Sequence, residues 1–173
     1  MSTAAEKPAR MREVARWAAL SIAVILLDQL TKLAIRHFFA PGEALTVTPF
    51  FDLVLVFNRG AAFSLFAQAS GWQYQFFIAV AAVAVVVIAT LLVRHRRQVW
   101  FCIALALILG GAIGNVIDRV SLGAVVDFLY FHVGPHYWPA FNVADSAITC
   151  GALLLIWDSF RQRRRVDGAG DPR

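Results

Sequence analysis

The stretch Gly110–Phe128, GGAIGNVIDRVSLGAVVDF, decides how the rest of the sequence is interpreted. It begins inside a long apolar run, carries Asn115, Asp118 and Arg119, passes through a predicted turn at Ser121–Gly123, and places Asp127 between two apolar residues. An isolated carboxylate in or beside hydrocarbon is costly, so an ionisable group at the end of a membrane-length apolar run is a candidate functional residue. The stretch therefore predicts a polar site at the edge of a membrane, with partner residues elsewhere in the chain.

The composition of the 173-residue chain is that of an integral membrane protein. Hydrophobic residues make up 60% of it and charged residues only 16%, and its mean hydropathy is +0.66. The formal net charge of +5 would indicate nucleic-acid binding only if the basic residues formed a patch with exposed aromatic side chains. They flank the apolar runs instead, so we expect no nucleic-acid partner.

Four apolar runs are candidates for membrane-spanning helices. They lie at about Ala15–Phe39, Phe76–Val93, Val99–Ile117 and Phe141–Trp157. Between the first two, Leu45–Phe57 is rich in Thr, Val and Phe and predicts a β element, broken or at a sheet edge at Pro49. Between the last two, His132–Trp138 contains Gly134-Pro135 and predicts a loop.

The predicted fold class is an all-α membrane protein with four transmembrane helices and a small extracytoplasmic β-cradle between the first two. We expect three regions: a cytoplasmic tail at residues 1–14, a four-helix domain at 15–160 with the cradle at about 40–73, and a basic cytoplasmic tail at 161–173.

The positions of the basic residues predict the orientation of the helices. Most of the sixteen Lys and Arg residues lie in the N-terminal segment, in the Arg94–Arg97 loop and in the C-terminal tail. The two other connections carry only Arg59 and Arg119. Because cytoplasmic flanks are rich in Lys and Arg, both termini are expected in the cytoplasm and the β element outside it.

Polar residues within the apolar runs converge at one depth of the membrane. Asp28 lies about 18 Å along a helix from Arg16, in the outer half of the bilayer. Lys32 is one turn further on, where it can offset the charge of Asp28, and we expect this pair to matter mainly for architecture. Asn115 and Asp118 end the third run, and Asn142 and Asp145 begin the fourth, so the common level is the outer membrane boundary.

Asp127 and Asp145 are the candidate catalytic pair. Two carboxylates within a few ångströms cannot both ionise easily and share a proton, so one can activate water while the other protonates a carbonyl oxygen. This chemistry needs no cofactor. The alternative is that each carboxylate only pairs with Arg119 or Lys32 and has a structural role.

Other chemistries have weaker support in the sequence. The serines of the outward layer, Ser64, Ser121 and Ser146, have no adjacent histidine for a Ser-His-Asp triad. His132 and His136 have the i, i+4 spacing of a metal site, but Gly134-Pro135 between them argues against a shared helical face.

A structural role is the simplest interpretation of the end of the third run. Asn115, Asp118 and Arg119 have the spacing of an Asp-Arg-Asn network that closes a helix end, and they would then support the catalytic residues without taking part in the reaction.

Five motifs in order resemble those of the lipoprotein signal peptidases, also called signal peptidase II. They are DQLTK (Asp28–Lys32), FNRGAAFS (Phe57–Ser64), GNVIDR (Gly114–Arg119), VVDF (Val125–Phe128) and FNVADSAI (Phe141–Ile148). The resemblance extends from about Ala15 to Phe160, and the motifs contain no departure from the family pattern.

The resemblance implies an aspartic endopeptidase of the bacterial inner membrane with its active site at the outer face. It would cleave diacylglyceryl-modified prolipoproteins on the N-terminal side of the lipidated cysteine, in contact with membrane lipid, and we expect it to act as a monomer without cofactor or metal. By motif, Asp127 and Asp145 are the catalytic pair. The residues that line or support the site are Asn58, Asn115, Asp118, Arg119, Asn142, Asp28 and Lys32.

The alternative from another class of protein is a small ion- or proton-coupled transporter, because intramembrane Asp and Lys residues also mark ion paths. The polar residues argue against it, since they gather at one level and do not form a path across the bilayer. Phe76–Val93 contains no charged residue that could form part of an ion path.

Overall fold

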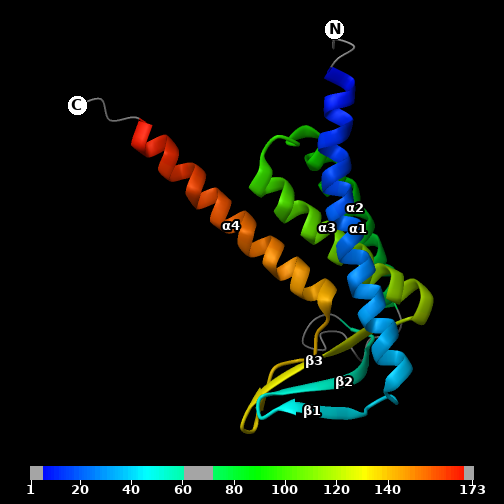
Figure 1. Cartoon of the computed structure of the whole chain (residues 1–173). Helices are drawn as coiled ribbons and strands as arrows, with labels where there is room; N and C mark the ends of the chain where they lie inside the picture. Colours follow the sequence, from blue (N-terminus) through cyan, green and yellow to red (C-terminus); the bar gives the residue numbers. More distant parts are fainter. Residues whose placement is uncertain (1–5, 61–71, 170–173) are drawn as a thin grey trace.

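Four helices form a bundle with an antiparallel sheet at one end (Figure 1). The computed structural model describes residues 6–60 and 72–169. α1 begins and α4 ends on the side of the bundle opposite the sheet. The elements in chain order are α1 (Glu6–Phe38), β1 (Ala44–Thr48), β2 (Phe51–Asn58), α2 (Trp72–Arg94), α3 (Val99–Leu122), β3 (Val125–Val133), β4 (His136–Tyr137) and α4 (Val143–Ala169).

All four predicted helices are present, and most extend beyond their apolar runs. α1 begins at Glu6, before the predicted start, and α4 continues to Ala169 through the arginine-rich segment. The predicted turn at Ser121–Gly123 is wrong in its first two residues, because α3 continues to Leu122. Gly123 ends the helix with a left-handed φ of 69°, and its N–H donates to the Arg119 carbonyl.

In the part of the chain that the structure describes, three helices are long and apolar enough to cross a membrane. The candidate spans are Met11–Phe38, Val99–Leu122 and Val143–Gln162. In the described part of α2, the apolar segment Ile78–Arg94 is shorter than a full span. Length and composition therefore support three spans directly.

The sheet differs from the prediction in its composition. Its strand order is β1-β2-β3-β4, so the connection between α3 and α4 supplies two of its four strands. The prediction of a loop at His132–Trp138 is wrong: β3 and β4 form a hairpin that turns at Gly134-Pro135. The hairpin was not predicted, because Gly-Pro is typical of a loop and the strand β4 that follows it is only two residues long.

The predicted break at Pro49 is confirmed, since β1 ends at Thr48 and a turn joins it to β2. A second irregularity lies between β2 and β3, where the register shifts between Leu53 and Val56. Val56 is paired with Asp127 directly after this shift. A bulge increases the local twist and can re-aim a side chain, so it helps to set where the Asp127 carboxylate lies.

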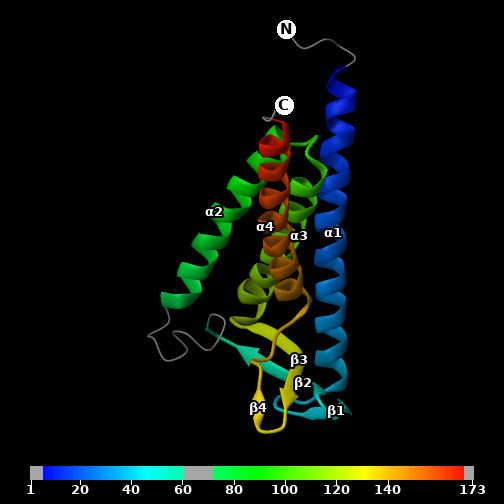
Figure 2. The same ribbon diagram turned by 90° about the vertical axis from the view of Figure 1, so that its left-hand side faces the viewer.

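α3 is the central helix of the bundle and contacts all three others. Figure 2 shows α2 leaning away from the other helices at its sheet end. Glycines of α3 let its neighbours approach closely: a Cβ on Gly110 would lie 2.7 Å from the Ser21 carbonyl oxygen of α1. Small residues at helix contacts are the usual means of close packing in membranes.

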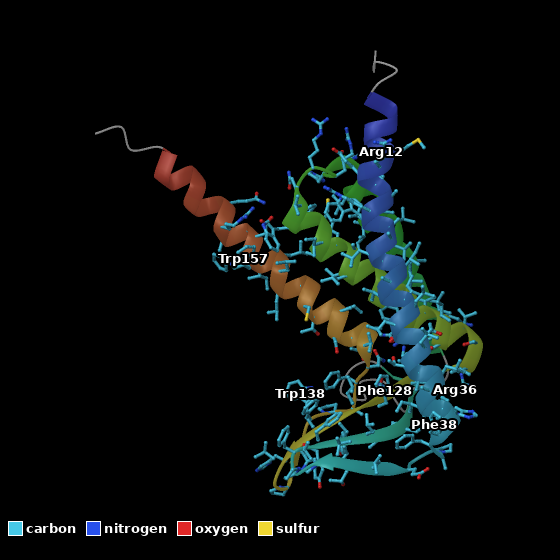
Figure 3. The ribbon with its side chains drawn as sticks, in the orientation of Figure 1. Arg12, Arg36, Phe38, Phe128, Trp138 and Trp157 are labelled. Carbon is cyan, nitrogen blue, oxygen red and sulfur yellow. The ribbon has the colours of Figure 1, made fainter. Side chains whose placement is uncertain are left out.

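Two clusters of buried apolar side chains lie at the two ends of the bundle. One, near the termini, includes Trp17, Leu92 and Leu105 from three helices. The other, which includes Ile35, Leu55 and Phe128, packs the end of α1 against the sheet (Figure 3). The sheet is therefore fixed to the bundle at the level where α1 ends.

We predict that Gly111→Ala destabilises the protein. Its Cβ would overlap the Ala144 carbonyl oxygen of α4, a main-chain atom that can move only if the helices separate. The expected loss is about 1–3 kcal/mol, measured as a lower melting temperature in detergent. Leu153→Ala is the matched control, because Leu153 is on α4 and 60% exposed. Equal melting temperatures for the two variants would contradict the close contact.

Candidate active site

A cavity of about 530 Å³ lies where α3 and α4 meet the sheet. Both predicted catalytic residues line it, Asp127 from β3 and Asp145 from the first turn of α4. The cavity is bounded mainly by apolar residues, with Trp138 and Phe141 on the sheet side and Ile148 on α4. In Figure 3, Trp138 lies between the sheet and α4.

Asp127 is almost completely buried, with an exposed fraction of 2%. Asn58 of β2 donates to its Oδ2 at 3.0 Å, and Asn142 donates to its Oδ1 at 2.7 Å. Burial, together with the nearby negative charge of Asp145, raises the pKa of Asp127 from 3.8 to about 7; the two amide donors and Lys32 oppose this. Near neutral pH, Asp127 can therefore hold a proton.

Asp145 is fixed by the cap of α4. Asn142 precedes the helix, and its Oδ1 accepts the Asp145 N–H at 2.9 Å. In return, Oδ2 of Asp145 accepts the Asn142 N–H at 3.3 Å, which makes a reciprocal capping box. Asn115 of α3 donates to the other oxygen, Oδ1, at 2.8 Å. The carboxylate therefore has a partner on each oxygen before any substrate binds.

Asn142 connects the two carboxylates. It is fully buried, its Nδ2 donates to Asp127, and its main chain and Oδ1 bond to Asp145. The same Nδ2 lies 3.2 Å from the Val126 carbonyl and 3.3 Å from Asn115 Oδ1. One amide therefore fixes the positions of both carboxylates and of the strand that carries Asp127.

Lys32 is the cation at the centre of the buried network. Its Nζ lies 2.8 Å from Asp28, 3.0 Å from Asp118 and 3.0 Å from Asn115 Oδ1. An ammonium group has three N–H donors, so all three are satisfied. The predicted Asp28–Lys32 pair is confirmed. Lys32 also contacts Asp118 and Asn115 of α3, so it joins α1 to α3.

Each of the two acidic partners of Lys32 also accepts a main-chain N–H. Asp28 Oδ1 accepts the Ala144 N–H at 2.9 Å, and Asp118 Oδ2 accepts the Val126 N–H at 3.0 Å. Asp28 is 0% and Asp118 3% exposed. The first contact joins residues 116 positions apart in the sequence, and the second joins α3 to the strand that follows it.

The predicted Asp-Arg-Asn network is correct only in part. Arg119 Nη1 donates to the Asn115 carbonyl at 3.3 Å, and Arg119 lines the cavity. The cation that pairs with Asp118, however, is Lys32 from α1. Spacing within one helix could not indicate this partner, because it comes from another helix.

The predicted site residues Asp28, Lys32, Asn58, Asn115, Asp118, Arg119 and Asn142 thus all surround the carboxylate pair or the network behind it. The suggestion that Arg119 or Lys32 alone satisfies Asp127 and Asp145 does not hold, since both carboxylates accept hydrogen bonds from asparagines. The second half of the FNRGAAFS motif, including Ser64, lies outside the described residues.

Sequence reasoning missed Gln29 and Gly114. Gln29 Nε2 lies 3.1 Å from Asp28 Oδ2, 3.0 Å from Asp118 Oδ1 and 3.2 Å from the Gly114 carbonyl. A Cβ on Gly114 would lie 2.6 Å from Asp28 Oδ2, so only glycine leaves room for this carboxylate. A neutral amide in an apolar run and the G-x-x-x-G spacing of Gly110 and Gly114 were the available signals.

The two histidines considered for a metal site lie in the β3–β4 hairpin. His132 is paired with Tyr137, and His136 with Val133, so the two imidazoles belong to adjacent rungs of the ladder. His132 Nε2 lies 3.3 Å from Asp52 Oδ2. Among the described residues, no group of three or more His, Cys, Asp or Glu side chains is arranged to hold a metal ion.

A second hollow of about 640 Å³ adjoins the first over the sheet. Asn58, Asp127 and Pro139 line both, so Asp127 borders the hollow over the sheet as well as the cavity beside α4. Tyr130 and Val54 form part of its floor. An extended chain that follows the sheet would therefore pass directly by Asp127.

The fold and the site together define a class of protein: a membrane enzyme with two carboxylates beside one cavity at the sheet end of its helix bundle. Comparison with solved structures also finds membrane enzymes. One bacterial membrane enzyme, solved by the in meso method at 2.3 Å resolution, is similar with a TM-score of 0.77 at 28% identity, over 86% of this chain and 90% of the other. A second, at 1.9 Å, has a TM-score of 0.74 at 29% identity, over 83% and 92%.

Sequence comparison gives the family. The pattern of the family described as Signal peptidase (SPase) II matches residues 20–161. A lipoprotein signal peptidase of Paraburkholderia phymatum is 56% identical over 98% of this chain and 99% of its own length. One of Burkholderia mallei is 56% identical over 90% and 92%. The chain belongs to the signal peptidase II family, which consists of aspartic peptidases, and is not a transporter.

The raised pKa of Asp127 predicts how stability depends on pH. The folded state binds this proton more tightly than the unfolded state, so the contribution of Asp127 to stability falls as pH rises from about 4 to about 7. Asp127→Asn cannot titrate, so its melting temperature should rise relative to the wild type between pH 5 and pH 8. A difference between the two proteins that does not change with pH would contradict the raised pKa.

Proposed function

We propose that Asp127 and Asp145 are the catalytic residues with which this member of the signal peptidase II family removes signal peptides from prolipoproteins. The observation that carries the proposal is that one buried amide, Asn142, bonds to both residues beside a single cavity. A pair of structural carboxylates would not need access to a cavity, whereas a catalytic pair does.

The chemistry follows from one proton shared by the two carboxylates. In the reactive state one carboxylate is ionised and accepts a proton from the attacking water. The other is protonated and donates to the carbonyl oxygen of the scissile peptide bond. Burial supports this division, since it disfavours a state in which both groups are charged.

Asn58 and Arg119 are the proposed supporting groups within the cavity. Asn58 donates to Oδ2 of Asp127 and so fixes the side of that carboxylate that faces the sheet. Arg119 lines the same cavity and is a cation close to where negative charge develops on the carbonyl oxygen. Asn115 holds Asp145 and is held in turn by Lys32.

The proposed substrate is a prolipoprotein that carries a diacylglyceryl group on cysteine, cleaved on the N-terminal side of that residue. The cavity supports a lipid-bearing substrate because its lining continues from Asp145 along α4 through Ile148 to Cys150, which is exposed. Acyl chains held in the bilayer would keep the scissile bond at the depth of the carboxylates.

The proposed arrangement in the inner membrane has four spans, with α2 as the fourth, and both termini in the cytoplasm. The sheet and the carboxylate pair then lie at the outer face, at the opposite end of the bundle from the termini (Figure 1). The basic Arg94–Arg97 loop, which lies at the end with the termini, supports this orientation. Nothing in the proposed reaction requires a second copy of the chain, so we propose a monomer.

We predict that Asp127→Asn and Asp145→Asn each lower the turnover of a diacylglyceryl-modified prolipoprotein in detergent by about 10²- to 10⁴-fold, because an amide cannot replace the shared proton. Both proteins should still fold and insert into membranes. Asp52→Asn is the matched control, since Asp52 pairs with His132 on the sheet outside the cavity. Near wild-type turnover of either cavity variant would overturn the assignment.

We predict that chelators leave the wild-type activity unchanged, since the proposed reaction uses only carboxylates. Activity would be measured after incubation with EDTA and again after addition of zinc. Loss in EDTA and recovery with zinc would contradict the mechanism and favour a metal site at His132 and His136.

We predict the orientation of the chain from cysteine labelling in intact inner membranes. In a Cys150→Ser background, Val133→Cys on the sheet should react with a membrane-impermeant maleimide added from outside. Arg97→Cys at the other end should not react. Val133 is 77% exposed and the Arg97 side chain 72%, so a difference would reflect orientation and not burial. If only Arg97→Cys reacts, the proposed orientation is wrong and the chain is inserted the other way round.

A further inference from the structure

Two main-chain contacts behind the active site have the same form. Asp28 accepts the N–H of Ala144, which directly precedes Asp145, at 2.9 Å. Asp118 accepts the N–H of Val126, which directly precedes Asp127, at 3.0 Å. In both cases a fully buried carboxylate holds the peptide that leads into a proposed catalytic aspartate.

A single cation joins the two contacts. Lys32 Nζ lies 2.8 Å from Asp28 Oδ2 and 3.0 Å from Asp118 Oδ2. Gln29, which follows Asp28 on α1, bridges the same two carboxylates: its Nε2 lies 3.1 Å from Asp28 Oδ2 and 3.0 Å from Asp118 Oδ1. The spacing between Asp28 and Asp118 is therefore fixed, and with it the spacing between the peptides that they hold.

We infer that Asp28 and Asp118 are positioning residues for the reaction: held at a fixed separation by Lys32, they set the relative positions of Asp145 and Asp127 through the preceding main-chain N–H groups. The inference rests on the proposed catalytic role of these two aspartates. It assigns to Asp28 and Asp118 an effect on turnover beyond the stability of a buried ion pair.

The physical reason is that the carboxylate pair must be placed accurately relative to the scissile bond. Asp145 is on the first turn of a helix and Asp127 on a strand, so no local structure relates the two. A displacement of about 1 Å at a reacting group can cost about 100-fold in rate. The contact also stabilises the first turn of α4 directly, because Asp28 accepts an N–H that has no partner within the helix.

A matched pair of variants separates positioning from the ion pair. Asp28→Asn/Lys32→Gln and Asp28→Ala/Lys32→Gln both remove the two charges. Only the first keeps an oxygen that can accept the Ala144 N–H, while its amide nitrogen can donate to the new glutamine. We expect kcat for the alanine variant to be about 10- to 100-fold lower than for the asparagine variant, with KM changed far less.

The same comparison applies to the strand. Asp118→Asn keeps an oxygen for the Val126 N–H and for Lys32, whereas Asp118→Ala keeps neither, so again only the alanine variant should lose most of its kcat. Ser21→Ala is the control for stability alone. Ser21 is buried in α1 and donates to the Ala106 carbonyl of α3 at 2.9 Å, far from the carboxylate pair. It should lower the melting temperature and leave kcat unchanged.

Amide hydrogen exchange of the wild-type protein tests the contacts without any variant. The N–H groups of Ala144 and Val126 should exchange as slowly as those in the centre of α3. Fast exchange at either position would overturn the inference even if the alanine variants fail to fold. Equal kcat values within both matched pairs would also overturn it. If the wild type fails to cleave a diacylglyceryl-modified prolipoprotein, the proposed function itself fails, which is a separate outcome.

Discussion

The buried ammonium group of Lys32 is the interaction on which the rest of the site depends. It is 2% exposed and contacts two carboxylates and one amide oxygen from α1 and α3. A charge buried in this way is tolerated only when it is fully paired, and removal of one partner of such a pair costs about 3–5 kcal/mol. Because Asp28 also holds α4 and Asp118 also holds β3, this one cation relates the positions of four elements.

The carboxylate pair is built on two elements, α4 and β3, and each carries its aspartate close to its first residue. Asp145 lies where α4 begins, in a capping box with Asn142. Asp127 lies on β3 beside a register shift, three residues into a strand that follows the glycine cap of α3. Helix ends expose main-chain donors, and strand irregularities re-aim side chains, so both locations suit functional groups.

Much of the site could be predicted because polar residues are costly in apolar runs. Asp28, Lys32, Asn115 and Asp145 each stand out in this way, and spacing alone brought them to one depth. The chemistry of paired carboxylates then indicated Asp127 and Asp145, and the family resemblance implied the same two residues. Local spacing also identified the Asp28–Lys32 pair correctly, since i, i+4 partners lie on one helix face.

The remainder depends on tertiary contacts that spacing within one segment does not encode. Asp118 was expected in a network with Asn115 and Arg119 of its own helix, and the cation that pairs with it at 3.0 Å is Lys32 of α1. Gln29 carries no charge, so its place in an apolar run was a weaker signal than that of Asp28 or Lys32, and its bridge between two carboxylates was missed. Strand β3 was missed because Val125–Val133 is mostly apolar and aromatic, which hides the alternation of a strand.

In the proposed mechanism, Asp127 and Asp145 act as a coupled pair that shares one proton. A carboxyl ¹³C NMR titration of the detergent-solubilised protein tests it most directly, with Asp127→Asn and Asp145→Asn to assign the two signals. We expect a step near pH 7, the value to which burial raises the pKa of Asp127, in which both signals move together. Two signals that titrate independently, with no step near pH 7, would contradict it.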